Sequence, residues 1–483
     1  VDSLVVPHGS SWGIYTPPGS SWDHQLTKEN HDPKRGRLIE VYSGHGNSEN
    51  YRNFQPRAFN ADGKVYCPEP QSNYLPSCWQ AGVIIKQRCE KSGSSVSDCN
   101  TRAEQARQHY VEIEGVSGWL SVPGSTVDDW LNAGQARDVF LPAFNYAPKK
   151  SVQYGLALRN FDDLNNPLRY KWGLIGSTDS HFARPGHGYK QFPRIGTGDA
   201  GMRGGRTPFW DWLIYERNKE KPLARSRSLL TPEGDSSISA SEQERKMSFL
   251  TAGGVVAVHA QGRDRAAIWN SLVKREVYGT SGHRILLWFD LINAGDHPQP
   301  MGSEVTMSKA PHFKVTAIGS FKQKPGCPKY VEQALQKKRL EHLSGGECYN
   351  PSYERYLIDR IEVVRIRPQN YANEAIEGLV EDIWQVFDCA PSPSGCTVEF
   401  SDMEFIEADR DAVYYVRAIE ELSPMINGGN LRAKRNSDGN VDQINPCYGD
   451  NRTDLNDNCL TMKGQRAWSS PIFVNTSHLE GSP

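Results

Sequence analysis

Residues 173–181 carry the strongest chemical signal in this 483-residue chain. An apolar run ends there in small residues and then presents Asp179 and His181, two positions apart. Because alternate residues of a strand point to the same face, both side chains can reach one ion. A carboxylate beside an imidazole suits zinc, manganese or iron. The spacing predicts a metal site at the end of a buried parallel strand. The alternative is a capped strand-to-turn junction without a metal.

Two further apolar runs near the start of the chain also end beside possible ligands. His8 closes the first run. Glu40 lies inside the second run, and His45 and Glu49 follow it closely. Any one of these histidines alone is more simply explained as a hydrogen-bonded core residue. Three strand-like runs in succession, each with such a residue near its end, favour one shared site.

Four stretches give the chain a resemblance to a known family: residues 6–10, 140–146, 173–181 and 275–285. They resemble the DUF3604 family, a group of unknown function that is similar to the PHP (polymerase and histidinol phosphatase) superfamily. The resemblance extends from about the first residue to Phe473.

This resemblance implies a metal-dependent hydrolase. The metal ligands that it implies are His8, Glu40, Asp179 and His181, holding two or three divalent ions of zinc, manganese or iron. His45 and Glu49 are the expected catalytic residues, one able to complete the cluster and the other to act as acid or base. Because such ions activate water and polarise ester oxygens, the expected substrate is a small phosphoester or related anionic ester.

The implied fold class is α/β, a PHP-like distorted (β/α) barrel followed by a β-sandwich-like C-terminal domain. From residue 285 onward, short alternating runs and turn signals replace the strand–helix pattern, which favours a sandwich. The expected units are a barrel portion at 1–283 with insertions at 52–135 and 182–250, a β-rich domain at 284–475 and a tail at 476–483.

One departure from the family pattern concerns the opening strands. The family's site begins with His-x-His on the first strand and Asp-His on a later one, and neither motif lies upstream of His8. A barrel cannot close without its first strands, so we expect an N-terminal segment or fragment of the same precursor to complete it.

The insertion at 182–250 is long, poor in strand signals and rich in basic residues. Loops of this length are usually either functional or solvated and flexible, and both interpretations stay open. As a lid, it would bind the anionic substrate through Arg184, His187, Lys190, Arg203 and Arg206. Arginine suits such recognition because its guanidinium binds oxyanions in a bidentate manner.

Charge and hydropathy exclude two classes of partner. The formal net charge is −2, so the basic excess of a nucleic-acid surface is absent. No apolar run approaches the roughly 20 residues of a membrane span.

The ten cysteines fall in close pairs that bracket polar loops: 67 and 78, 89 and 99, 327 and 348, 389 and 396, 447 and 459. None of them has the paired Cys-x-x-Cys spacing of a zinc site. Local disulfides explain the spacing best, although connectivity cannot be deduced from sequence alone. Disulfides persist in oxidising compartments, so we expect a periplasmic or secreted protein.

A second function stays open beside the hydrolase. The missing first-strand motif is also compatible with a non-catalytic secreted binding protein whose metal site is incomplete. Serine-hydrolase chemistry is disfavoured, because no Gly-x-Ser-x-Gly elbow precedes an evident triad.

Overall fold

The computed structural model describes residues 2–13, 16, 19–113, 118–141, 145–179, 220–229, 245–344, 348–448, 453–454 and 456–477. These residues form a mixed α/β structure with several sheets, most of whose strand pairs are antiparallel. The described residues contain no closed barrel.

A small sheet delivers the predicted strand ends. It has the order β2-β1-β5, with β1 at Leu38–Ser43, β2 at Gly46–Asn47 and β5 at Gly173–Gly176. β1 and β5 are parallel, with Leu38 opposite Gly173, which confirms the prediction for the second and third apolar runs. All of β1 is buried, and its Ile39 is fully covered.

The first apolar run does not form a strand, and that expectation is wrong. Residues 2–8 have no regular secondary structure. Pro7 has no N–H to donate to a ladder. The run makes isolated backbone bonds instead, with Val5 N donating to Arg35 O and Pro7 O accepting from Glu40 N. Val5 is 58% exposed, so this segment lies along the surface.

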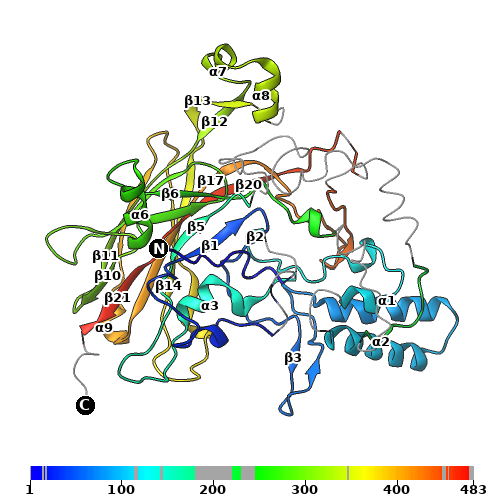
Figure 1. The fold of residues 1–483 in the computed structure, drawn as a ribbon. Helices are drawn as coiled ribbons and strands as arrows, with labels where there is room; N and C mark the ends of the chain where they lie inside the picture. Colours follow the sequence, from blue (N-terminus) through cyan, green and yellow to red (C-terminus); the bar gives the residue numbers. More distant parts are fainter. Residues whose placement is uncertain are drawn as a thin grey trace.

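A large sheet of eight strands lies beside the small sheet, on the side away from α1 and α2 (Figure 1). Its strands are β6 (Val255–Val258), β7 (Val277–Thr280), β10 (Glu304–Met307), β14 (Ile358–Ile366), β15 (Val380–Asp388), β17 (Ala412–Ile426), β20 (Leu460–Ser469) and β21 (Ile472–Thr476). β6 lies at the edge of this sheet. It pairs antiparallel with β7, and helix α6 (Arg265–Lys274) lies between the two strands in the sequence.

A four-stranded antiparallel sheet packs on one face of the large sheet. It contains β8 (Leu286–Leu291), β9 (Gln299–Pro300), β11 (His312–Ile318) and β16 (Cys396–Ser401). Phe289 and Phe313 share a core with Tyr414 of the large sheet. This packing agrees with the strand–strand pattern read from residue 285 onward.

The opposite face of the large sheet packs on the small sheet. Ile39 and Leu174 share a second core with Tyr415 and Trp468. Successive residues Tyr414 and Tyr415 therefore belong to different cores, as the two-residue period of a strand requires. The large sheet is thus the middle layer of three, and most residues of its strands β14 and β17 are buried.

The remaining elements are shorter or lie outside these layers. They are β3 (Ala58–Phe59), β4 (Val65–Tyr66), α1 (Ser77–Lys91), α2 (Val96–Val111), α3 (Val152–Ala157), β12 (Phe321–Pro325), α7 (Lys329–Ala334), α8 (Lys337–Ser344), β13 (Tyr349–Arg355), α9 (Phe405–Ala408), β18 (Lys434–Arg435) and β19 (Val441–Gln443). The small sheet lies between the large sheet and the hairpin of α1 and α2 (Figure 1). Ser95 caps α2, and its Oγ accepts from Asp98 N.

The ten cysteines pair as neighbours, as the spacing predicted: Cys67–Cys78, Cys89–Cys99, Cys327–Cys348, Cys389–Cys396 and Cys447–Cys459. Five disulfides are consistent with an extracytoplasmic protein. Among the described residues, no helix combines the length and apolar character needed to cross a bilayer.

Two glycines allow the small sheet to approach the large one. A Cβ on Gly279 of β7 would lie 2.6 Å from Gly176 N. A Cβ on Gly176 would lie 2.6 Å from Thr280 O. Both contacts are to backbone atoms, which cannot rotate away, so β5 and β7 can lie this close only without side chains.

We predict that Gly279→Ala destabilises the protein by about 2 kcal/mol or more, because the added methyl must push two strands apart. Denaturant unfolding of the whole protein measures the change. The matched control is Gly295→Ala, whose Cβ would have nothing within 4 Å and should change the unfolding free energy little. Equal effects of the two substitutions would contradict the close packing of β5 on β7.

Candidate metal centre

Three side chains from separate segments meet at the ends of β1 and β5. His8, His45 and Asp179 each offer one ligand atom, and these atoms lie within 4.8 Å of one another. His8 Nε2 is 3.6 Å from Asp179 Oδ1, and His45 Nδ1 contacts Asp179 Oδ2. The two imidazole rings are 5.4 Å apart, edge to face. We call these three residues the metal group.

The parallel pairing of β1 and β5 explains how two members of the metal group meet. His45 lies in the turn that follows β1, and Asp179 follows β5. Adjacent parallel strands end at the same edge, so residues just past their ends become neighbours. Asp179 has a φ of +54°, a left-handed conformation that aspartate tolerates better than most residues. Asp179 packs closely on Gly44: a Cβ added to Gly44 would lie 3.3 Å from the Cβ of Asp179.

Glu40 is not a member of the metal group but contacts His8 on the ring nitrogen that faces away from Asp179. Its Oε1 is 2.9 Å from His8 Nδ1 and also accepts from Gly9 N at 3.3 Å. Ser177 Oγ donates to the other carboxylate oxygen. When His8 Nδ1 donates to this carboxylate, the lone pair lies on Nε2, which faces Asp179. A carboxylate that orients an imidazole in this way is the usual outer partner of a metal-binding histidine.

Among its three members, the metal group is exposed to solvent mainly through His8. The side chains of His45 and Asp179 are 5% and 8% exposed, whereas that of His8 is 46% exposed. Trp12 is fully buried and its ring centroid lies 4.6 Å from that of His45. Water or a small ligand can therefore reach the group past His8, while the other two residues are fixed within the protein.

The structure brings together part of the predicted site. His8 and Asp179 lie in the metal group, and Glu40 lies next to it. His45, expected as a catalytic residue, also belongs to the group. His181 and the proposed substrate-binding residues lie outside the described residues: Arg184, His187, Lys190, Arg203 and Arg206.

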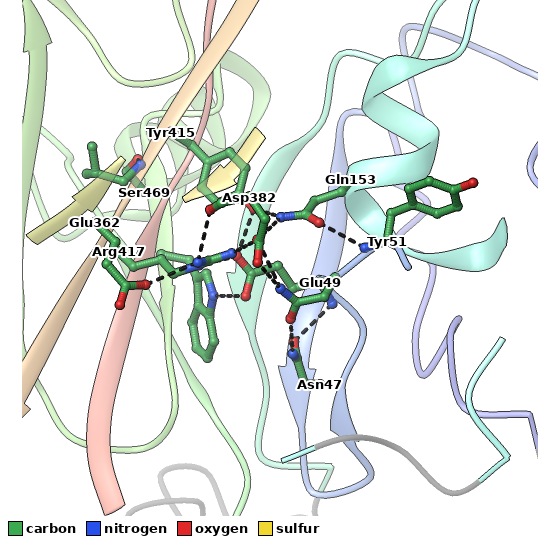
Figure 2. Close-up of polar contacts among 12 residues, drawn as sticks. Asn47, Glu49, Tyr51, Gln153, Glu362, Asp382, Tyr415, Arg417 and Ser469 are labelled. Carbon is green, nitrogen blue, oxygen red and sulfur yellow. Dashed lines mark hydrogen bonds and ion pairs between the residues drawn. The ribbon is translucent and has the colours of Figure 1, made fainter. Parts of the chain in front are cut away.

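Glu49, the other expected catalytic residue, lies in a different environment (Figure 2). It is fully buried, and its carboxylate accepts from Tyr415 OH at 2.7 Å, Arg417 Nε at 2.5 Å and Trp468 Nε1 at 2.7 Å. These donors come from the central strands β17 and β20. Both carboxylate oxygens of Glu49 thus bind the large sheet. The sequence could not show this, because the partners are more than 360 residues away.

Glu49 is one member of a buried ionic cluster around Arg417. The guanidinium of Arg417 also contacts Glu362, at 3.1 Å, and Asp382. Arg52 reaches Asp382 at 2.9 Å from the other side. Burial alone would raise the pKa of Asp382, but the charges of Arg417 and Arg52 outweigh it and hold this pKa well below its usual range. We call these five residues the Arg417 cluster.

Two cavities open elsewhere on the molecule, with volumes of about 430 and 520 Å³. They share Asp23, Gln55 and Lys149 as lining residues. No residue of the metal group lines either of them.

Comparison with known proteins supports one family. Residues 133–324 match the family described as "Protein of unknown function (DUF3604)". The resemblance is therefore confirmed over this stretch, which contains Asp179, while His8, Glu40 and His45 precede it. No curated protein matches the chain, and no solved structure matches it.

We predict that Asp382→Asn lowers the unfolding free energy by about 3 kcal/mol near neutral pH, because it leaves buried guanidinium charge under-compensated. Since the pKa of Asp382 is lower in the folded state, its contribution is complete above the unfolded pKa of about 3.9 and is lost as the pH falls toward the folded value. The difference in unfolding free energy between wild type and Asp382→Asn should therefore become smaller as the pH falls.

Urea unfolding at a series of pH values measures this gap. Glu407→Gln is the control, because Glu407 is exposed and forms no ion pair with another described residue. A gap that stays constant down to strongly acidic pH would contradict the assigned role of Asp382.

Proposed function

We propose that this protein is a metal-dependent hydrolase that acts on a phosphoester or a related anionic ester. The observation that supports this most directly is the metal group, in which ligand atoms of His8, His45 and Asp179 lie within 4.8 Å of one another. The site lies at the ends of parallel strands, which agrees with a PHP-like relationship. We propose that relationship and a periplasmic or secreted location together with the activity.

The donor chemistry fits a divalent transition metal. Two imidazoles and one carboxylate are ligands that zinc, manganese and iron accept. Catalytic zinc sites commonly have three protein ligands and keep a further position for water or substrate. When bound, such an ion supplies a water of lowered pKa and polarises the ester oxygen. His181 is the residue we propose as a further ligand if the site holds two or three ions.

The chain's own residues have distinct tasks in this proposal. Glu40 fixes the ring of His8 so that Nε2 faces Asp179. Trp12 covers His45 and keeps water from its buried side. The side of the group that His8 leaves open is the route for an anionic ester, which the basic residues between 184 and 206 would bind.

Metal content tests the proposed site without relying on turnover. We expect protein purified without chelator to contain bound transition metal, and His45→Ala and Asp179→Asn to retain less than about a tenth of an equivalent. Elemental analysis measures this, and His297→Ala, which changes an exposed histidine, is the matched control. Wild-type protein that stays metal-free after incubation with zinc, manganese or iron would refute the site.

Hydrolysis of chromogenic esters tests the reaction itself. The metal-loaded protein should hydrolyse at least one of a phosphomonoester, a phosphodiester and a sulfate ester, and should lose this activity with chelator and in His45→Ala. If the metal-loaded protein cleaves none of these esters, the hydrolase proposal is wrong and a non-catalytic binding protein is favoured.

Glu40→Gln tests the positioning role of this carboxylate. The substitution keeps an acceptor for His8 Nδ1 but removes the charge, so we expect metal affinity to fall by about 10- to 100-fold. Competition with a chelator of known affinity gives the constant, and circular dichroism checks the fold. Loss of all metal binding would instead make Glu40 a direct ligand, and an unchanged affinity would exclude both roles.

A further inference from the structure

An arm within residues 321–355, described at 321–344 and 348–355, stands out from the body of the molecule (Figure 1). Its stem is the antiparallel pair of β12 and β13, and its tip consists of α7 and α8. The Cys327–Cys348 disulfide closes the stem next to the tip. Neither α7 nor α8 buries a single residue, so packing against the body does not account for these helices.

The arm is basic, although the chain as a whole is slightly acidic. It contains seven lysines and arginines, four glutamates and no aspartate, whereas the whole chain has a net charge of −2. Four of the cations are exposed on the two helices of the tip: Lys329, Lys337, Lys338 and Arg339. Only Lys337 has a nearby carboxylate among the described residues, Glu341 at 4.0 Å. That pair is 90% and 60% exposed, so it neutralises little.

Exposed apolar side chains lie among these cations. Tyr330 on α7 is 73% exposed and Leu343 on α8 is 45% exposed. On the stem, Tyr353 is 97% exposed. None of them belongs to the three cores of the protein. A mixture of lysine, arginine, tyrosine and leucine on short surface helices is the composition of segments that lie at a membrane–water interface.

We propose that the arm binds an anionic lipid surface through its tip. Charge complementarity favours this partner, because each lysine or arginine near an anionic bilayer contributes to binding. The shape agrees as well: the tip is a projection without a cavity of its own among those described, and a fluid bilayer needs no complementary concave surface. Tyr330 and Leu343 would enter the headgroup region while the cations contact phosphate groups. The arm would hold the protein at the surface without any membrane-spanning segment.

Vesicle sedimentation of the full chain tests this proposal. The probes are vesicles of phosphatidylcholine alone and of phosphatidylcholine mixed with phosphatidylglycerol. We expect binding only to the mixed vesicles, weakening as salt is added because the attraction is screened. The triple variant Lys337→Glu/Lys338→Glu/Arg339→Glu should bind at least about 100-fold more weakly, since three favourable charges become unfavourable. Tyr330→Ser/Leu343→Ser should bind more weakly but keep its salt dependence.

The matched control reverses three exposed cations on other parts of the surface: Lys34→Glu/Lys64→Glu/Arg263→Glu. It has the same net charge as the arm variant and should bind almost as wild type does. Equal loss in both variants would show a net-charge effect and overturn the arm as the binding site. The lipid proposal is overturned if the wild type does not bind mixed vesicles. Binding to soluble polyglutamate is measured in parallel, and its result does not change that conclusion. Arm-dependent polyglutamate binding in that case would identify an acidic protein as the partner class.

Discussion

A buried guanidinium needs hydrogen-bond acceptors or compensating charge, and for Arg417, between two layers of this protein, carboxylates supply both. It lies on β17, the long central strand, and binds carboxylates from three other segments. One of them, Glu49, follows His45 by only four residues. Because breaking a buried pair leaves an uncompensated charge, the segment that carries His45 cannot shift relative to the large sheet without a large cost. The Arg417 cluster thus fixes the position of the segment that carries His45 relative to the large sheet.

Close packing adds a second constraint on the same interface. The contact between Gly176 and Gly279 places β5 directly on β7, and Asp179 follows β5 by three residues past its end. Ionic contacts therefore fix the segment after β1, while backbone contacts fix β5. The third member of the metal group, His8, lacks a strand of its own and depends on Glu40, inside β1, for its orientation. All three positions are thus set by β1, β5 and the layer beneath them.

The sequence predicted those features that depend on local pattern. The runs that became β1 and β5, the placement of Asp179 past a strand end and the pairing of cysteines 7–21 residues apart all follow from spacing. Features that depend on distant partners were missed. The sequence places Glu49 just past a strand but does not show its contacts with β17 and β20. The PHP-like barrel portion expected at 1–283 is also not seen among the described residues, because β6 pairs antiparallel with β7 instead of extending the parallel sheet. Glu40 did offer a signal, because a carboxylate that lies between apolar neighbours inside a buried strand needs a partner.

The most direct test of the metal centre is anomalous diffraction from crystals of the full chain grown or soaked with zinc or manganese. We expect an anomalous peak about 2.0–2.2 Å from His8 Nε2, a ring nitrogen of His45 and a carboxylate oxygen of Asp179, with Glu40 still bound to His8 Nδ1. A peak that is absent there, while the metal occupies other sites or none, would contradict the central claim that these strand ends form a metal site.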